Sequence, residues 1–169
     1  MRSSTPEVMD VSTLNLVRPS SLKVSAMFDL YSDPESISLI ETFALAKKPI
    51  ASVCHGPAIL LRPILPSGEP LIASATVTGF SNLEEDALGT TAKMPFLLED
   101  EMHRLSGKYV KAEETFGEKV VVSEVKGLGG VLITGQNPAS AKRRWRGIGR
   151  SLGVVMLRRS PISWVKGSI

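Results

Sequence analysis

Short apolar runs alternate with amphipathic stretches through the middle of the chain. The apolar runs are rich in β-branched residues and predict strands at residues 49–53, 76–79, 109–112, 120–123 and 131–134. Residues 22–26 are expected to form one further strand. Helices are predicted between the strands, at residues 34–48, just after residue 81, and at 95–105. Because strands and helices alternate, the pattern predicts an α/β domain with a mainly parallel sheet.

Local signals define the ends of these helices. Asp33 is expected to cap the first long helix, and Pro34 suits its first turn. One apolar stripe follows along that helix, formed by Ile37, Ile40, Phe43 and Ala44. The helix should end before Pro49, since the residue before a proline disfavours helical backbone. Asn82 is expected to cap the short helix, and Gly107 to close the helix at 95–105.

The composition is that of a soluble globular protein. The chain has 169 residues, of which 43% are hydrophobic and 22% charged, enough for one domain with a core. A single cysteine excludes an intramolecular disulfide and indicates a reducing compartment, so we expect a cytoplasmic or nuclear location. No apolar run reaches the roughly 18 residues of a membrane span, and no secretory signal precedes the domain. We therefore expect no membrane partner.

The net charge of +3 is unevenly distributed. Residues 141–169 hold eight basic residues and no acidic residue, while residues 1–140 hold 12 basic and 17 acidic residues. Trp145 and Trp164 lie among the arginines, which is one pattern of a nucleic-acid surface. Charge runs are more often solvated faces, so we expect no nucleic-acid partner.

A sharp turn is predicted where the strand at 49–53 meets the apolar run at 58–61. Gly56 and Pro57 open that second run, which predicts a helix with a proline in its first turn. Cys54 lies at the junction, in the place that a strand-turn-helix elbow gives to a nucleophile.

Two interpretations of Cys54 follow from the residues alone. At a helix N-terminus the partial positive charge favours thiolate, so we expect the pKa of Cys54 to lie below its ordinary value. His55 follows directly and offers a base. The alternative is a buried structural cysteine, which is what most lone cysteines are.

Five segments carry a resemblance to a known family. The string Val53-Cys54-His55-Gly56-Pro57-Ala58 is similar to the nucleophile elbow of the ThiJ/PfpI superfamily, which is related in fold to class I glutamine amidotransferases. The other similar segments are residues 26–30 (AMFDL), 77–85 (VTGFSNLEE), 95–100 (PFLLED) and 132–140 (LITGQNPAS). Together they resemble the glutathione-independent glyoxalase branch, also called glyoxalase III or D-lactate dehydratase. The resemblance runs from about Ala26 to about Lys142.

The resemblance implies a fold, a reaction and a site. The implied fold is a flavodoxin-like sandwich with a mainly parallel sheet. The implied enzyme is a lyase that converts methylglyoxal, a 2-oxoaldehyde, to D-lactate. The implied reaction passes through a cysteine hemithioacetal and uses no cofactor or metal. Cys54 would be the nucleophile and His55 the general acid and base. Glu85 would orient His55, with Glu84 or Asp86 as the other choices. A homodimer is a candidate assembly.

The resemblance also predicts three parts of the chain. Residues 1–21 are expected to form a poorly ordered head, 22–142 an incomplete ThiJ/PfpI-like domain truncated at its N-terminus, and 143–169 an atypical basic tail. The family's first strand carries a glutamate that hydrogen-bonds the cysteine, and Glu7 lies in no matching motif. We expect impaired activity and an uncovered sheet edge as a result.

Other functions share this pattern. A non-catalytic stress-response chaperone, or a redox sensor that uses Cys54 as a peroxide target, is the leading alternative. A cysteine peptidase or amidotransferase shares the elbow. His103 lies among polar helix positions and is expected at the surface. With two histidines and one cysteine in the chain, no metal site is expected.

Overall fold

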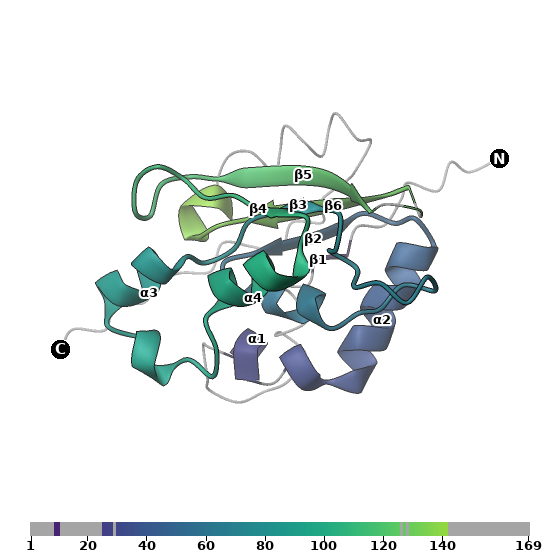
Figure 1. The fold of residues 1–169 in the computed structure, drawn as a ribbon, viewed down its shortest axis with the longest axis horizontal. Helices are drawn as coiled ribbons and strands as arrows, with labels where there is room; N and C mark the ends of the chain where they lie inside the picture. The colour runs from purple at the N-terminus through teal and green to yellow at the C-terminus, as the bar shows by residue number, and fades with distance from the viewer. Residues whose placement is uncertain (1–8, 11–24, 29, 126, 128, 142–169) are drawn as a thin grey trace, which may run out of the picture.

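A four-stranded sheet forms one layer of the molecule, and helices α1, α2 and α4 lie together on one side of it in Figure 1. The computed structural model describes residues 9–10, 25–28, 30–125, 127 and 129–141. The strand order in the sheet is β1-β2-β6-β5. These strands are β1 (Met9–Asp10), β2 (Ile50–Val53), β5 (Val120–Val125) and β6 (Gly130–Gly135).

Most neighbouring strands in this sheet are parallel. β2 runs parallel to β6 from the pair Ile50–Leu132 to the pair Val53–Gly135, and β1 runs parallel to the start of β2. β5 is antiparallel to β6 and completes a hairpin with it. The mainly parallel α/β sheet predicted from the alternating pattern is therefore confirmed.

A second, two-stranded sheet lies beside the first. It pairs β3 (Thr76–Val77) with β4 (Lys108–Tyr109), in parallel. The Thr76 amide donates a hydrogen bond to the Ser123 hydroxyl on β5, and the Thr78 amide donates to the Thr134 hydroxyl on β6, each near 3 Å. Side-chain oxygens of the large sheet thus hold β3 and the residue that follows it.

The helices are short, and several connections are single 3-10 turns. The α-helices are α1 (Ser25–Phe28), α2 (Pro34–Leu45), α3 (Asn82–Leu88) and α4 (Leu98–Leu105). The 3-10 helices span Leu30–Ser32, Gly56–Leu61, Thr91–Lys93 and Pro138–Ala141. Among the described residues, no helix is long and apolar enough to cross a membrane.

Helix α2 begins as the sequence predicted. The Asp33 carboxylate accepts a hydrogen bond from the Ser36 amide at 3.0 Å, which satisfies one of the free donors at the helix start. Ile40 and Ala44 are fully buried against the core, as the apolar stripe requires. The helix ends at Leu45, and Pro49 is reached through a turn in which Lys47 has a φ of 57°.

Several predicted element ends were wrong. The helix predicted at 34–48 ends at Leu45, and the strands predicted at 76–79 and 109–112 are Thr76–Val77 and Lys108–Tyr109. Residues 25 and 26 begin helix α1 instead of ending a strand, and this turn buries Met27 in the core. Ser81, not Asn82, caps α3, because its hydroxyl and amide exchange hydrogen bonds with Glu84 in a capping box. Helix α4 begins at Leu98, three residues after its predicted start, and ends at Leu105 as predicted, with Ser106 as its C-cap before Gly107.

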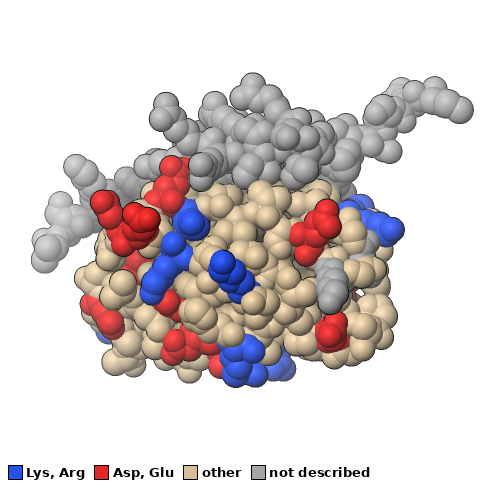
Figure 2. Space-filling model, turned by 45° about the horizontal axis from the view of Figure 1, so that its top comes forward, with Lys and Arg blue, Asp and Glu red and all other residues tan. Residues whose placement is uncertain are grey.

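The predicted head and tail fall mostly outside the described residues. Residues 142–169, which hold the basic tail, lie outside them entirely, as do residues 1–8 and 11–24. Within the predicted head, Met9 and Asp10 pair with Ile50 and Ala51, so β2 is not a bare edge at its first two residues. Over the described residues in the view of Figure 2, acidic and basic side chains are interspersed on a largely uncharged surface.

The main core lies between the large sheet and the helices. Its largest fully buried side chains come from α2, the 3-10 helix at 56–61, the turn before β3, helix α4 and β6: Ile40, Ile59, Leu60, Leu71, Ile72, Leu98, Met102 and Leu132. Burying each such side chain contributes on the order of 1.5–3 kcal/mol. Because the whole 56–61 helix is buried in the core, it fixes the position of the turn that precedes it.

Candidate active site

Cys54 lies in a sharp turn between β2 and the 3-10 helix at 56–61. Its φ is +63°, in the left-handed region that costs a non-glycine residue roughly 1–2 kcal/mol. Two backbone hydrogen bonds hold it there: the Cys54 amide donates to the Gly135 carbonyl, and the Cys54 carbonyl accepts from the Phe80 amide, both at 3.0 Å. The elbow geometry predicted from the sequence is therefore present.

Three of the predicted residues meet in one hydrogen-bonded row. The Cys54 sulfur lies 3.4 Å from His55 Nδ1, and His55 Nε2 lies 2.6 Å from Glu85 Oε1. Since a carboxylate only accepts, Nε2 carries a proton, and in the neutral imidazole Nδ1 is then free to accept the thiol proton. The His55 side chain is 20% exposed and that of Glu85 is 3% exposed, so the row reaches solvent at the histidine ring and is closed at Glu85.

The structure distinguishes Glu85 from the two other candidate acids. Both oxygens of Glu84 are engaged by other donors, Ser81 and Asn137. Asp86 is exposed and accepts a hydrogen bond from Thr91. On a helix, successive side chains are rotated by about 100°, so only one of three consecutive acids can face the histidine.

Glu84 is a fully buried carboxylate whose role the sequence did not reveal. Its two oxygens accept from the Ser81 amide at 2.8 Å, the Ser81 hydroxyl at 2.9 Å and Asn137 Nδ2 at 2.7 Å. The same Asn137 nitrogen donates to the Gly117 carbonyl at 2.7 Å. This network connects the start of α3, which carries Glu85, to the loop before β5 at Gly117 and to the loop after β6 at Asn137. The capping-box spacing of Ser81 and Glu84 was the one signal in the sequence that could have revealed it.

The predicted low pKa of Cys54 was wrong. Burial raises the pKa of the Cys54 thiol from 9.0 to about 12; a hydrogen bond from the His55 backbone amide opposes the rise, while the charges of Glu84 and Glu85 add to it. The expected helix field is weak because the following helix is a six-residue 3-10 segment, so desolvation and the buried acids of α3 outweigh it. Cys54 at rest is thus a thiol.

An aromatic pair lies against the histidine. The ring of Phe80 is centred 4.5 Å from that of His55, and Phe116 is 6.4 Å beyond Phe80. Phe80 is buried, whereas Phe116 is 42% exposed and has a φ of +62°. No sequence signal indicated Phe116, because its loop has neither periodicity nor a motif.

The second histidine lies outside the row. The His103 side chain is 58% exposed on α4, 3.9 Å from Glu99, which confirms the predicted surface position. Within the described part of the chain, no three histidine, cysteine or acidic side chains are grouped to hold a metal ion.

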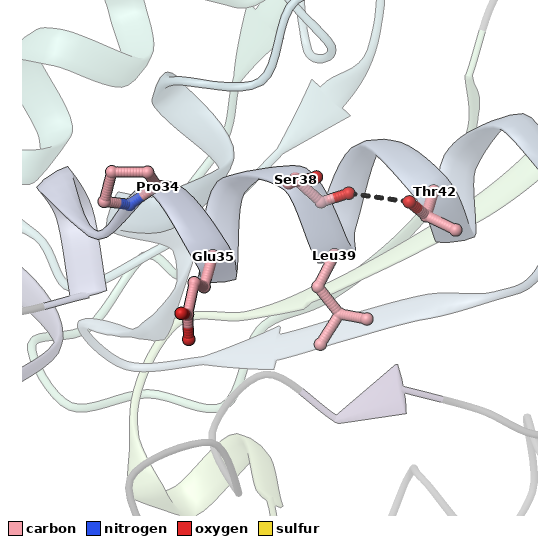
Figure 3. Close-up of a pocket in the computed structure, with 5 residues that line it drawn as sticks. All are labelled: Pro34, Glu35, Ser38, Leu39 and Thr42. Atoms are coloured by element: carbon pink, nitrogen blue, oxygen red, sulfur yellow. Dashed lines mark hydrogen bonds between the residues drawn. The ribbon is translucent and has the colours of Figure 1, made fainter.

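A separate hollow of about 440 Å³ lies on the outer face of α2. Figure 3 shows Glu35 and Leu39 pointing into the same space, with Ser38 and Thr42 joined by a hydrogen bond of 2.8 Å along the helix. Its lining residues are Pro34, Glu35, Ser38, Leu39 and Thr42. None of the three residues of the cysteine row borders it, so this hollow is not the site of the proposed chemistry.

Comparison with known proteins gives relatives of one kind. Glyoxalase 3 of Candida albicans is 32% identical over 121 residues, which are 68% of this chain and 48% of that protein. Glutathione-independent glyoxalase HSP31 of Saccharomyces cerevisiae is 34% identical over 97 residues, 54% of this chain and 38% of that protein. No protein-family model matches the chain. The chain thus spans at most about half the length of these curated relatives.

Solved structures agree in fold. The Rapid Encystment Protein 24 KDa of Francisella tularensis aligns with a TM-score of 0.67 and 32% identity, over 76% of this chain and 54% of that one. Glyoxalase III of Candida albicans aligns with a TM-score of 0.65 and 26% identity, over 75% and 52%. The fold and the cysteine elbow are those of the flavodoxin-like ThiJ/PfpI class. Within that class, the named relatives confirm the resemblance to the glyoxalase III branch.

Proposed function

We propose that this chain carries the site of a glutathione-independent glyoxalase of the D-lactate dehydratase type, a lyase that converts methylglyoxal to D-lactate. The observation that carries the proposal is the continuous row from the Cys54 sulfur through both nitrogens of His55 to Glu85, with spacings of 3.4 and 2.6 Å. Relatives named for this activity support it. The substrate is a small 2-oxoaldehyde.

The first step is thiol addition. The Cys54 sulfur bonds to the aldehyde carbon while its proton passes to His55 Nδ1, and the resulting imidazolium protonates the former carbonyl oxygen to give a hemithioacetal. Because the pKa of the thiol is about 12, the proton must move as the bond forms. Glu85 stabilises the imidazolium that appears between these two transfers.

The second step moves hydrogen between the two carbons. His55 takes the proton from the hemithioacetal carbon. A double bond forms between the two carbons, the neighbouring carbonyl oxygen receives an electron pair and a proton, and an enediol results. The second carbon is then protonated while the first becomes a carbonyl carbon. This leaves a lactate thioester on Cys54. Water adds to the thioester carbon and expels the thiol, so the net reaction adds one water to the oxoaldehyde. One carbon is oxidised and the other reduced, which requires no external electron acceptor.

The test measures D-lactate from methylglyoxal with no glutathione present. We expect Cys54→Ala and His55→Gln to abolish formation, since each removes a member of the row. His103→Gln is the matched control, because it changes the chain's other, exposed histidine. Equal rates for the native chain and Cys54→Ala would overturn the assigned nucleophile, and a requirement for added glutathione would overturn the reaction.

Other readings give different outcomes. Suppression of client aggregation that survives Cys54→Ala, with no lactate formed, would favour a chaperone. Peroxide sensing depends on thiolate, and the raised pKa of Cys54 opposes it. Hydrolysis of peptide or glutamine amide bonds would indicate a peptidase or amidotransferase. A homodimer and a cytoplasmic or nuclear location belong to the same proposal; light scattering and localisation of the tagged chain test them.

A further inference from the structure

The carboxylate of Glu85 has a second hydrogen-bond partner that the cysteine row does not include. One oxygen, Oε1, accepts from His55 Nε2, and the other, Oε2, accepts from the hydroxyl of Thr90. The Glu85 side chain is 3% exposed. Within the described residues, His55 and Thr90 are its side-chain partners, so each oxygen of a nearly buried carboxylate depends on one donor.

The local backbone explains why Thr90 reaches this oxygen. Helix α3 ends at Leu88, and Gly89 turns the chain back with a φ of +64°, a conformation that glycine adopts without steric cost. The Thr90 amide then donates to the Glu85 carbonyl at 3.0 Å, and the Thr90 hydroxyl lies 3.2 Å from that same carbonyl. The turn at the end of α3 thus places the Thr90 hydroxyl next to the Glu85 carboxylate.

We propose that Thr90 is a positioning residue that extends the row to Cys54–His55–Glu85–Thr90. By holding Oε2, its hydroxyl prevents the Glu85 carboxylate from rotating, which keeps Oε1 on His55 Nε2 and leaves Nδ1 facing the sulfur. A buried carboxylate oxygen left without a donor would instead turn toward any available group. This role in catalysis rests on the proposed function, but its effect on the thiol does not.

Three threonine variants test the role. Thr90→Val keeps the shape and removes the hydroxyl, Thr90→Ser restores it, and Thr91→Val is the matched control because Thr91 contacts the exposed Asp86. We expect Thr90→Val to lower kcat for D-lactate about 10- to 100-fold with KM within about twofold, since positioned proton transfer contributes about 10²–10⁴-fold. Thr90→Ser should stay within about threefold of the native kcat, and Thr91→Val should be unchanged.

A second readout is independent of glyoxalase activity. The rate at which iodoacetamide alkylates Cys54 at pH 7.5 reports how readily His55 accepts the thiol proton, and Thr90→Val should slow it severalfold while Thr91→Val does not. Melting followed by circular dichroism identifies variants that fail to fold, and if Thr90→Val is one of them, Thr90→Ala replaces it, since it also lacks the hydroxyl. If the native chain forms no D-lactate but Thr90→Val still slows alkylation, the positioning role stands and the glyoxalase reaction fails. Native alkylation in Thr90→Val, or a Thr90→Ser variant as slow as Thr90→Val, would overturn the role of the hydroxyl.

Discussion

The thiol of Cys54 should react slowly with alkylating agents at neutral pH, despite its place in a nucleophile elbow. Burial raises its pKa from 9.0 to about 12, and the two buried acids of α3 reinforce the shift. The thiolate is the form that attacks iodoacetamide, so the fraction ionised controls the rate. Unfolding the chain in urea removes the burial and returns the same sulfur to ordinary behaviour.

The magnitude follows from the two pKa values. At pH 7.5 about 3% of an ordinary thiol of pKa 9.0 is ionised. The ionised fraction of the folded thiol, whose pKa is about 12, is about a thousandfold smaller. A more basic thiolate is intrinsically more nucleophilic, and a Brønsted slope of about 0.45 recovers roughly 20-fold of this difference. The folded chain should therefore be alkylated about 50-fold more slowly than the urea-unfolded chain.

The assay uses the fact that the chain has one cysteine. Mass spectrometry of the intact chain then counts a single addition, and the rate is measured from pH 6 to pH 10 in the folded and unfolded states. The folded rate should rise about tenfold per pH unit with no plateau in that range, whereas the unfolded rate should level off near pH 9. A folded rate that levels off near pH 7 would show an activated thiolate and would refute the reasoning from burial.

Three further changes have defined outcomes. Because the pKa of Cys54 is raised on folding, the neutral thiol stabilises the fold below about pH 9, and this stability should be lost by up to about 1.4 kcal/mol per pH unit as the pH rises toward 12. In urea titrations at increasing pH, Cys54→Ala should make the slope shallower by that amount, while the buried Tyr109, whose pKa is also raised, keeps its own slope. Asn137→Ala leaves the buried Glu84 without its amide donor and should lower the free energy of unfolding by about 2–4 kcal/mol in the same assay at pH 7, and a loss below about 0.5 kcal/mol would contradict the network. Gly107→Ala would place a Cβ within 2.8–3.0 Å of the Ser74 backbone and should cost about 1–3 kcal/mol, measured as a lower urea midpoint; an unchanged midpoint would show that this contact yields freely.

Much of the fold could be predicted because its signals are local. The cap at Asp33, the apolar stripe through Ile40 and Ala44, and the strand-turn-helix at Cys54 depend on neighbours a few residues apart, so their spacing is visible in the chain. Helix α1 and the start of α4 were mispredicted, since they depend on which side chains the core buries. Met27 becomes buried through a helical turn that the local pattern did not indicate.

The sequence by itself determined the residue types of the site and the sharp turn that carries Cys54 and His55. Only the tertiary structure decided which acid faces the histidine, because the direction of Glu85 depends on where α3 packs. The same holds for Thr90, which reaches the carboxylate through the turn at Gly89, and for the thiol pKa, which burial raises against the expectation from its place before a helix. Backbone turns follow from local residue preferences, whereas desolvation and charge depend on atoms brought together from distant parts of the chain.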